Sequence, residues 1–217
     1  MKRLYIVVEG QTEREFVNSM IAPYLCGMGL FSVVPVLIRT SKTGRGGFVA
    51  YEHLKRDVRN LLNSNNNDLV VSMFVDFFRI PEVPGKACWS SLPNHLLQVE
   101  EMEKCINDDI DDKRFIPYIQ LHEFEALLFS SNIGFESWFT SEEAMQTNVI
   151  VESFNNPEDI NTTLDGAPSK RLLAIKSSYQ KVLEGNLIAL EIGMDTILQK
   201  CPRFKAWINH LVVACCD

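Results

Sequence analysis

The chain has 217 residues, of which 46% are hydrophobic and 23% are charged, and this composition is ordinary for a globular protein that buries a sizeable core. The formal net charge is −7, which disfavours a broad surface that coats nucleic acid, because such surfaces are usually basic. No stretch approaches the roughly 18 uninterrupted apolar residues of a membrane span. We therefore expect a globular protein that does not enter a membrane.

The cysteines and the first residues indicate a cytoplasmic protein. Because the cysteines are scattered and form no CxxC pair, a zinc site is not expected, and they are typical of small buried thiols. The apolar run 4–8 is too short for a signal peptide and is followed by Glu9, so it predicts a first strand instead. The six cysteines are Cys26, Cys88, Cys105, Cys201, Cys215 and Cys216.

The first 130 residues alternate between apolar runs typical of buried strands and segments with helical periodicity. The predicted strands are 4–9, 31–38, 69–75 and 115–121. The predicted helices are 13–26, 49–63 and 94–109, and residues 123–129 form the beginning of another helix. Such alternation predicts an α/β fold whose central sheet is mostly parallel and is flanked by helices.

Local signals refine this prediction. Thr12, with Glu15 three residues later, has the spacing of a capping box at a helix start, and Pro23 should kink or shorten that helix. Pro35 favours an edge position for the second strand. The segment 79–93 contains three prolines and a glycine, which predicts a loop.

After residue 130 the strand signals stop. Helical patterns cover 141–154, 170–184, 187–198 and 204–213. We therefore expect an α/β core at 1–130 and a helical C-terminal appendage at 131–217 that packs on it.

Acidic residues follow three of the predicted strands. Glu9 ends the first strand, Asp76 ends the third, and Glu123 and Glu125 follow the fourth. The carboxyl ends of parallel strands meet at one edge of a sheet, where ligands bind in open α/β folds. Because Mg²⁺ and Mn²⁺ prefer oxygen ligands, these carboxylates predict a metal site that serves phosphoryl chemistry. A solvated strand end is the plain alternative for any one of them.

The segments around these acids resemble Toprim-like domains. The segment 8–13 (Val-Glu-Gly-Gln-Thr-Glu) resembles their opening, where the first strand ends in the catalytic glutamate. The segments 76–81 (Asp-Phe-Phe-Arg-Ile-Pro) and 122–129 (His-Glu-Phe-Glu-Ala-Leu-Leu-Phe) resemble the second and third motifs. The segment 167–172 (Ala-Pro-Ser-Lys-Arg-Leu) is similar to a signature of one uncharacterised branch.

This resemblance implies an activity and a partner. Its nearest characterised relatives are nucleases of the overcoming-lysogenization-defect type, which are often encoded beside ATPases in phage-defence loci. The resemblance implies that Glu9 is a general acid/base or a metal ligand, that Asp76 holds Mg²⁺, and that Glu123 and Glu125 add ligands. One departure is that Phe78 stands where the common pattern has a second aspartate. Metal binding then depends on Glu123, Glu125 or Glu13.

Basic residues in two places are candidates for contacts with the nucleic-acid backbone. Arg39, Lys42 and Arg45 lie in or beside the glycine-rich segment 40–47, which lacks the Gly-Lys-Ser/Thr ending of a nucleotide-binding loop. A plain mobile loop is the alternative there. Lys170 and Arg171 open a predicted helix, and a solvated helix face is the alternative for them.

The sequence therefore favours an Mg²⁺-dependent nuclease that acts on DNA or RNA as the effector of an ATPase. One alternative is a non-catalytic module of the same fold that binds nucleic acid or protein, which Phe78 and the negative net charge favour. Another is an enzyme that transfers phosphate on a small molecule.

Overall fold

A computed structural model describes residues 2–40, 48, 50–64, 68–160 and 166–216. It has the expected α/β fold, with a sheet in the order β2-β1-β3-β4 in which β5 also pairs with β3, and every pair is parallel. β2 lies at an edge, as Pro35 predicts. The strands are β1 (Arg3–Val8), β2 (Ser32–Leu37), β3 (Leu69–Asp76), β4 (Phe115–Ile116) and β5 (Ile119–Gln120).

Helices make up most of the rest of the described chain. The α-helices are α1 (Gln11–Phe16), α2 (Ala22–Gly27), α3 (Tyr51–Leu62), α4 (Lys86–Trp89), α5 (His95–Ile110), α6 (Ile133–Trp138), α7 (Ser141–Ser153), α8 (Pro168–Ile175), α9 (Asn186–Ile192), α10 (Met194–Lys200) and α11 (Pro202–Cys216). The other helical turns are η1 (Val17–Ile21), η2 (Phe124–Ser130), η3 (Pro157–Asp159) and η4 (Lys181–Gly185). No helix of the described residues is long and apolar enough to cross a membrane.

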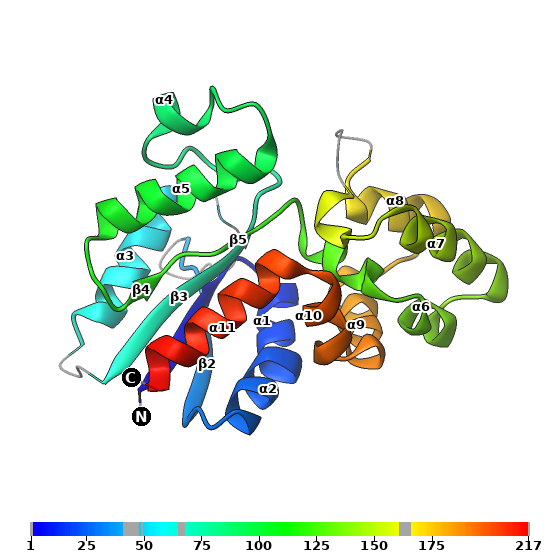
Figure 1. The fold of residues 1–217 in the computed structure, drawn as a ribbon, viewed down its shortest axis with the longest axis horizontal. Coiled ribbons are helices and arrows are strands. Elements are labelled where there is room, and N and C mark those ends of the chain that lie inside the picture. Colours follow the sequence, from blue (N-terminus) through cyan, green and yellow to red (C-terminus); the bar gives the residue numbers. More distant parts are fainter. Residues whose placement is uncertain (1, 41–47, 49, 65–67, 161–165, 217) are drawn as a thin grey trace.

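The sheet is covered on both faces. α3 and α5 pack against one face, while α1, η1, α2 and α11 pack against the other (Figure 1). All eight residues of β3 are buried, as expected for a strand between two helical layers. The end of β3 therefore lies deep in the middle of the sheet edge, where Asp76 is only 7% exposed.

The start of the first helix differs from the sequence prediction. The helix begins at Gln11 after Gly10, whose position provides no side-chain cap, and Thr12 is buried inside the first turn. The capping-box prediction is therefore wrong. Pro23 does not shorten the helix, which passes through the π-helical turn η1 before the proline and continues as α2 to Gly27.

Four predicted elements are interrupted, and one of them is the helix predicted at 187–198, which is broken at Gly193 between α9 and α10. The fourth strand is split into β4 and β5 around Pro117, which has no N–H to donate to a ladder. The helix predicted at 170–184 ends at Ile175, and η4 follows after a turn. The loop predicted at 79–93 contains the short helix α4.

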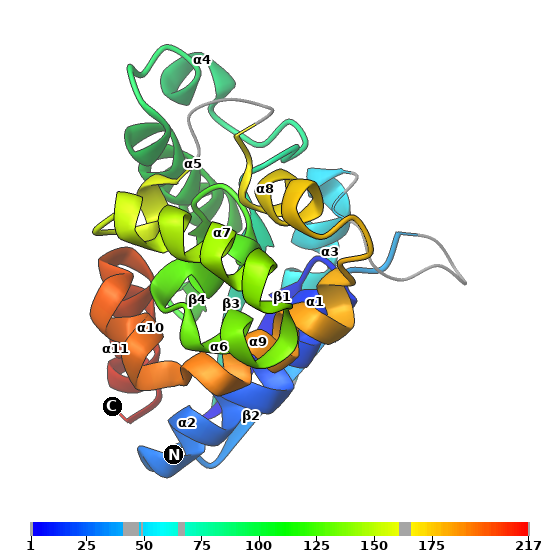
Figure 2. The same cartoon turned by 90° about the vertical axis from the view of Figure 1, so that its right-hand side faces the viewer.

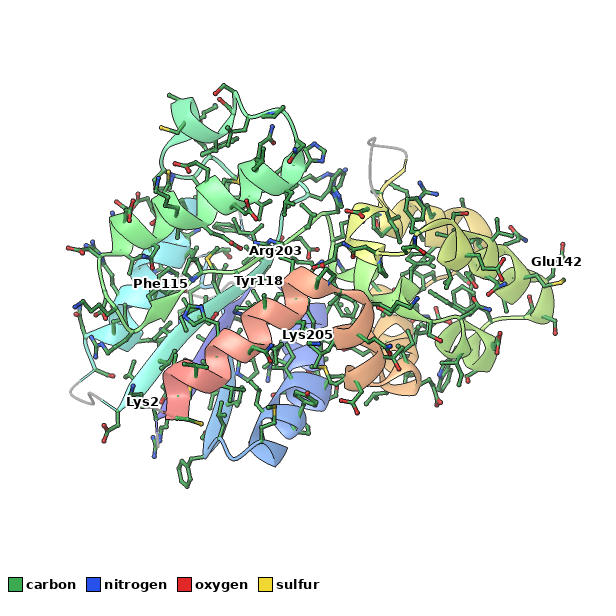
Figure 3. The ribbon with its side chains drawn as sticks, in the orientation of Figure 1. Lys2, Phe115, Tyr118, Glu142, Arg203 and Lys205 are labelled. Atoms are coloured by element: carbon green, nitrogen blue, oxygen red, sulfur yellow. The ribbon has the colours of Figure 1, made fainter. Side chains whose placement is uncertain are left out.

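The last helix returns to the sheet. α6 to α9 form a group beside the sheet, whereas α11 lies across it and ends near the N-terminus (Figures 1 and 2). Trp207 donates from Nε1 to Ser72 Oγ in β3 at 3.0 Å, and Lys2 donates from Nζ to the carbonyl of Ala214 at 3.0 Å. At the other end of α11, the guanidinium of Arg203 lies 4.8 Å from the ring centre of Tyr118 (Figure 3).

Candidate functional site

Four acidic side chains and one lysine come together at the carboxyl edge of the sheet, and we refer to them as the acid cluster. Glu9 follows β1, Glu13 lies in α1, Asp76 ends β3 and Glu125 lies in η2. Lys181, the first residue of η4, places its ammonium among them. Its Nζ lies 3.2 Å from Asp76, 3.2 Å from Glu125 and 3.6 Å from Glu13.

The backbone holds the carboxylates close together. Gly10, between β1 and α1, leaves room for the carboxylate of Glu13, whose Oε2 would lie 3.0 Å from a Cβ at this position. Asp76 accepts a hydrogen bond from the N–H of Phe124 at 2.9 Å, which ties the end of β3 to the start of η2. Two residues at this edge have left-handed backbone, Arg79 at φ 61° and His122 at φ 70°. Such strain in non-glycine residues clusters at functional sites.

The surroundings raise the pKa of three of the carboxyl groups. Burial, with Asp76 and Glu13 nearby, raises the pKa of Glu9 to about 7. Burial raises the pKa of Glu125 to about 8, with Asp76 adding to the shift and Lys181 opposing it. Burial and Asp76 also raise the pKa of Glu13. Perturbed carboxyl groups that share one edge of a sheet are typical of a functional site.

Lys181 is the charge that compensates this cluster. Burial alone would lower its pKa, but Asp76, Glu125 and Glu13 outweigh burial and raise it. Lys181 is therefore an ammonium at neutral pH. If all four carboxyl groups ionise, one ammonium leaves three negative charges uncompensated within the cluster.

Glu125 is a buried carboxyl group of the cluster whose ionic partner is Lys181. Its side chain is fully buried, and neither oxygen accepts a hydrogen bond. The ammonium of Lys181 is within ion-pair distance of Oε2 without donating a hydrogen bond to it. A buried carboxyl group without donors is unfavourable unless it is protonated or gains a cationic partner.

The donor set of the acid cluster suits a hard cation. Within the part of the chain that the structure describes, no three acidic, histidine or cysteine side chains are arranged to hold a metal ion as they stand. Instead, the ammonium of Lys181 occupies the point toward which three carboxylates converge. The unused oxygens of Glu125 fit a divalent cation in chemistry, and such an ion would require Lys181 to move aside.

Glu123 has a different set of contacts. Its two carboxylate oxygens accept hydrogen bonds from the N–H and the hydroxyl of Ser169, each at 2.9 Å. Ser169 lies in the first turn of α8, so Glu123 holds the start of this helix to the edge of the sheet. Its predicted role as a metal ligand stays a prediction.

His122 precedes these residues and is buried. Its ring lies 5.4 Å from that of His95, and its Nδ1 has no hydrogen-bond partner. Burial, together with His95, lowers the pKa of His122 to about 4. The imidazole is therefore neutral at physiological pH.

The predicted nucleic-acid contacts lie in different surroundings. Lys42 and Arg45 lie outside the described residues. Arg39 is exposed, and its backbone N–H donates to Asp57 at 2.7 Å. Lys170 is exposed, whereas Arg171 donates to the carbonyl of Gly166 at 2.8 Å and so has a structural contact.

Sequence reasoning missed three residues of the site. Tyr179 lies between α8 and η4 and Lys181 begins η4, both inside what the sequence predicts as one helix, and no spacing signal links them to residues 9, 76 or 125. The hydroxyl of Tyr179 is buried without a partner, and burial and Glu125 raise its pKa. Ser169 belongs to the segment 167–172, which the sequence analysis selects. There, however, only the basic residues Lys170 and Arg171 are interpreted as functional.

No curated protein and no solved structure matches the chain. A family model described as "Domain of unknown function (DUF4276)" matches residues 8–212. That description names no activity, so the resemblance to Toprim-like domains stays a prediction. Because the match spans nearly the whole sequence, the chain belongs to the DUF4276 family.

Proposed function

We propose that this protein is a nuclease that depends on Mg²⁺ or Mn²⁺ and cleaves nucleic-acid phosphodiesters at the acid cluster. The observation that carries the proposal is Glu125, a fully buried carboxyl group that accepts no hydrogen bond and lies beside Asp76 and Lys181. Ionising a buried carboxyl group that has an ionic partner but no hydrogen-bond donor is costly, and sites of this kind are typical of function rather than of packing.

Each residue of the cluster has a distinct part in this proposal. Asp76 and Glu125 would supply oxygen ligands of the ion, and Glu13 is a further candidate ligand. When bound, the ion supplies polarisation of a phosphoryl oxygen and lowers the pKa of water. Glu9, with a pKa of about 7, is suited to take a proton from the attacking water or to return one to the leaving oxygen.

In this proposal Lys181 has one role before the substrate binds and another afterwards. Without a substrate, its ammonium lies near three carboxylates and limits their repulsion. Its side chain is 35% exposed, so it can turn outward when another cation enters. There it would pair with a phosphate oxygen of the nucleic acid.

The proposal is tested by cleavage of labelled single- and double-stranded DNA and RNA with Mg²⁺, with Mn²⁺ and with chelator. We expect cleavage with metal and none with chelator. Asp76→Asn and Glu125→Gln should each lower the rate by at least about a hundredfold, since a metal ligand contributes several kcal/mol to transition-state stabilisation. Glu142→Gln is the matched control, because Glu142 is exposed in α7, far from the sheet (Figure 3).

Two outcomes would reject the nuclease. Cleavage that survives in Asp76→Asn would show that it comes from elsewhere or from a contaminant. Binding of nucleic acid without cleavage in any metal would favour the non-catalytic module, which the position of Lys181 and the presence of Phe78 also favour. The proposed ATPase partner rests on the family resemblance, and co-purification with the product of a neighbouring ATPase gene tests it.

A further inference from the structure

A second feature lies at the same edge of the sheet as the acid cluster. A cavity of about 520 Å³ opens between the end of β5, the start of α5 and η3. Its size is within the range of about 300–1,000 Å³ that is usual for small-molecule sites. It is separate from the acid cluster, since none of the cluster's residues lines it.

One wall of the cavity is aromatic. His95 and His122 both line it, with their ring centres 5.4 Å apart. Phe77, the residue after Asp76, lies 5.2 Å from the ring of His95. The ring of His95 therefore contacts both other rings, although Phe77 does not line the cavity itself, and planar rings are the surfaces on which nucleobases stack.

His122 forms a buried part of the cavity wall. His122 is 3% exposed, and its Nδ1 is buried and makes no hydrogen bond. The left-handed backbone of His122, at φ 70°, indicates that the structure keeps this orientation at a cost in conformational energy.

The charge of the cavity disfavours a phosphate. Glu158 and Asp159 line it, and a phosphate would be repelled by both carboxylates. Glu158 accepts hydrogen bonds from the backbone N–H groups of Arg203 and Phe204, whereas Asp159 is exposed. A carboxylate of this kind is an acceptor for the amino or imino hydrogens of a base.

We propose that this cavity binds a nucleobase, stacked on His95 beside His122 and hydrogen-bonded to Asp159. This inference rests on the proposed function, because it assigns the cavity to a nucleotide next to the cleaved phosphodiester. A base in this cavity must be unstacked, so the substrate class is a single strand or an unpaired end rather than a continuous duplex.

The test is an NMR titration in chelator with the four nucleoside 5′-monophosphates and, as the probe without a base, ribose 5-phosphate. We expect at least one nucleotide to bind and to shift the imidazole signals of His95 and His122, and ribose 5-phosphate to bind at least tenfold more weakly. His95→Ala should weaken the nucleotide by at least about fivefold, the lower end of what a stacking side chain contributes. Asp159→Asn should change the preference among the four bases.

The control variant is His210→Ala, since His210 is an exposed histidine of α11 that lines a different cavity. It should leave the affinity unchanged. Equal binding of ribose 5-phosphate would make this a phosphate site and overturn the proposal, as would unaltered affinity in His95→Ala or no binding of any nucleotide. Because the titration contains no metal, its result is separate from the cleavage assay: base binding without cleavage rejects only the nuclease, and cleavage without base binding rejects only this cavity.

Discussion

At the scale of single residues, the acid cluster makes stability depend on pH. The carboxyl groups of Glu125 and Glu9 have pKa values of about 8 and about 7 in the fold, compared with about 4.3 in an unfolded chain. The folded state therefore binds more protons than the unfolded state between about pH 4.3 and pH 8, and stability falls as the pH rises through that window. The charges that face Glu125 are Lys181, Asp76 and Glu123.

Glu125→Gln isolates this effect. The glutamine keeps the shape of the side chain and removes the group that must ionise, so the variant should lose less stability than the native chain between pH 5 and pH 8 in chelator. Thermal melts at intervals of half a pH unit measure it, with Glu142→Gln as the exposed control. Parallel pH curves for the native chain and Glu125→Gln would contradict the raised pKa of Glu125.

Lys181→Met tests the compensating charge. Removing the ammonium leaves Asp76, Glu125 and Glu13 without their common partner. We expect a loss of about 1–3 kcal/mol at pH 7 in chelator, which is less than for a fully buried pair because Lys181 is partly exposed. If the cluster binds a cation, added Mg²⁺ should restore more stability in this variant than in the native chain.

Lys205→Met is its control, because Lys205 is exposed on α11 (Figure 3). Denaturant unfolding curves with and without Mg²⁺ provide the measurement. If Lys181→Met is as stable as the native chain in chelator, the ammonium does not compensate the carboxylates. An equal gain from Mg²⁺ in Lys181→Met and in the native chain would indicate that the ion binds elsewhere.

At the scale of elements, the sequence predicts the strands and helices whose formation depends on the local pattern of apolar and polar residues. Long apolar runs predict β1, β2 and β3, and helical periodicity predicts α3 and α5, close to their observed bounds. The elements that the sequence mispredicts depend on contacts made far along the chain. β4 and β5 are each two residues long, and they exist as strands only because β3 is there to pair with them.

The sequence likewise predicts only those residues of the candidate site that follow from local pattern. Strand ends predict the neighbourhood of Glu9, Asp76 and Glu125, because parallel strands bring their carboxyl ends to one edge whatever the helices do. Lys181 comes from a turn in the helical part of the chain, 105 residues from Asp76. Nothing local to Lys181 indicates that contact, since its position depends on how α8 ends and η4 begins.

At the scale of the whole molecule, the division at residue 130 does not separate two cores. One cluster of buried side chains contains Phe16 and Phe74 from the sheet half together with Phe135, Ile188 and Trp207 from the helical half. α11 completes a face of the sheet, and its Trp207 donates to Ser72 of β3. Since the helices after residue 130 finish the same core, we expect the two halves to unfold together.

The three tryptophans provide a test of this cooperativity. Trp89 lies in α4, Trp138 in α6 of the helical group, and Trp207 in α11 on the sheet. Three variants that each keep one tryptophan, with phenylalanine at the other two positions, report from these places separately. Within each variant, the fluorescence transition in urea should coincide with the loss of helical circular dichroism, as two-state unfolding requires. A Trp138 transition at lower urea concentration than the circular dichroism of the same variant would mean that the helical group unfolds on its own. In that case the acid cluster would lose Lys181 before the sheet unfolds, and Lys181 would not contribute to the stability of the core.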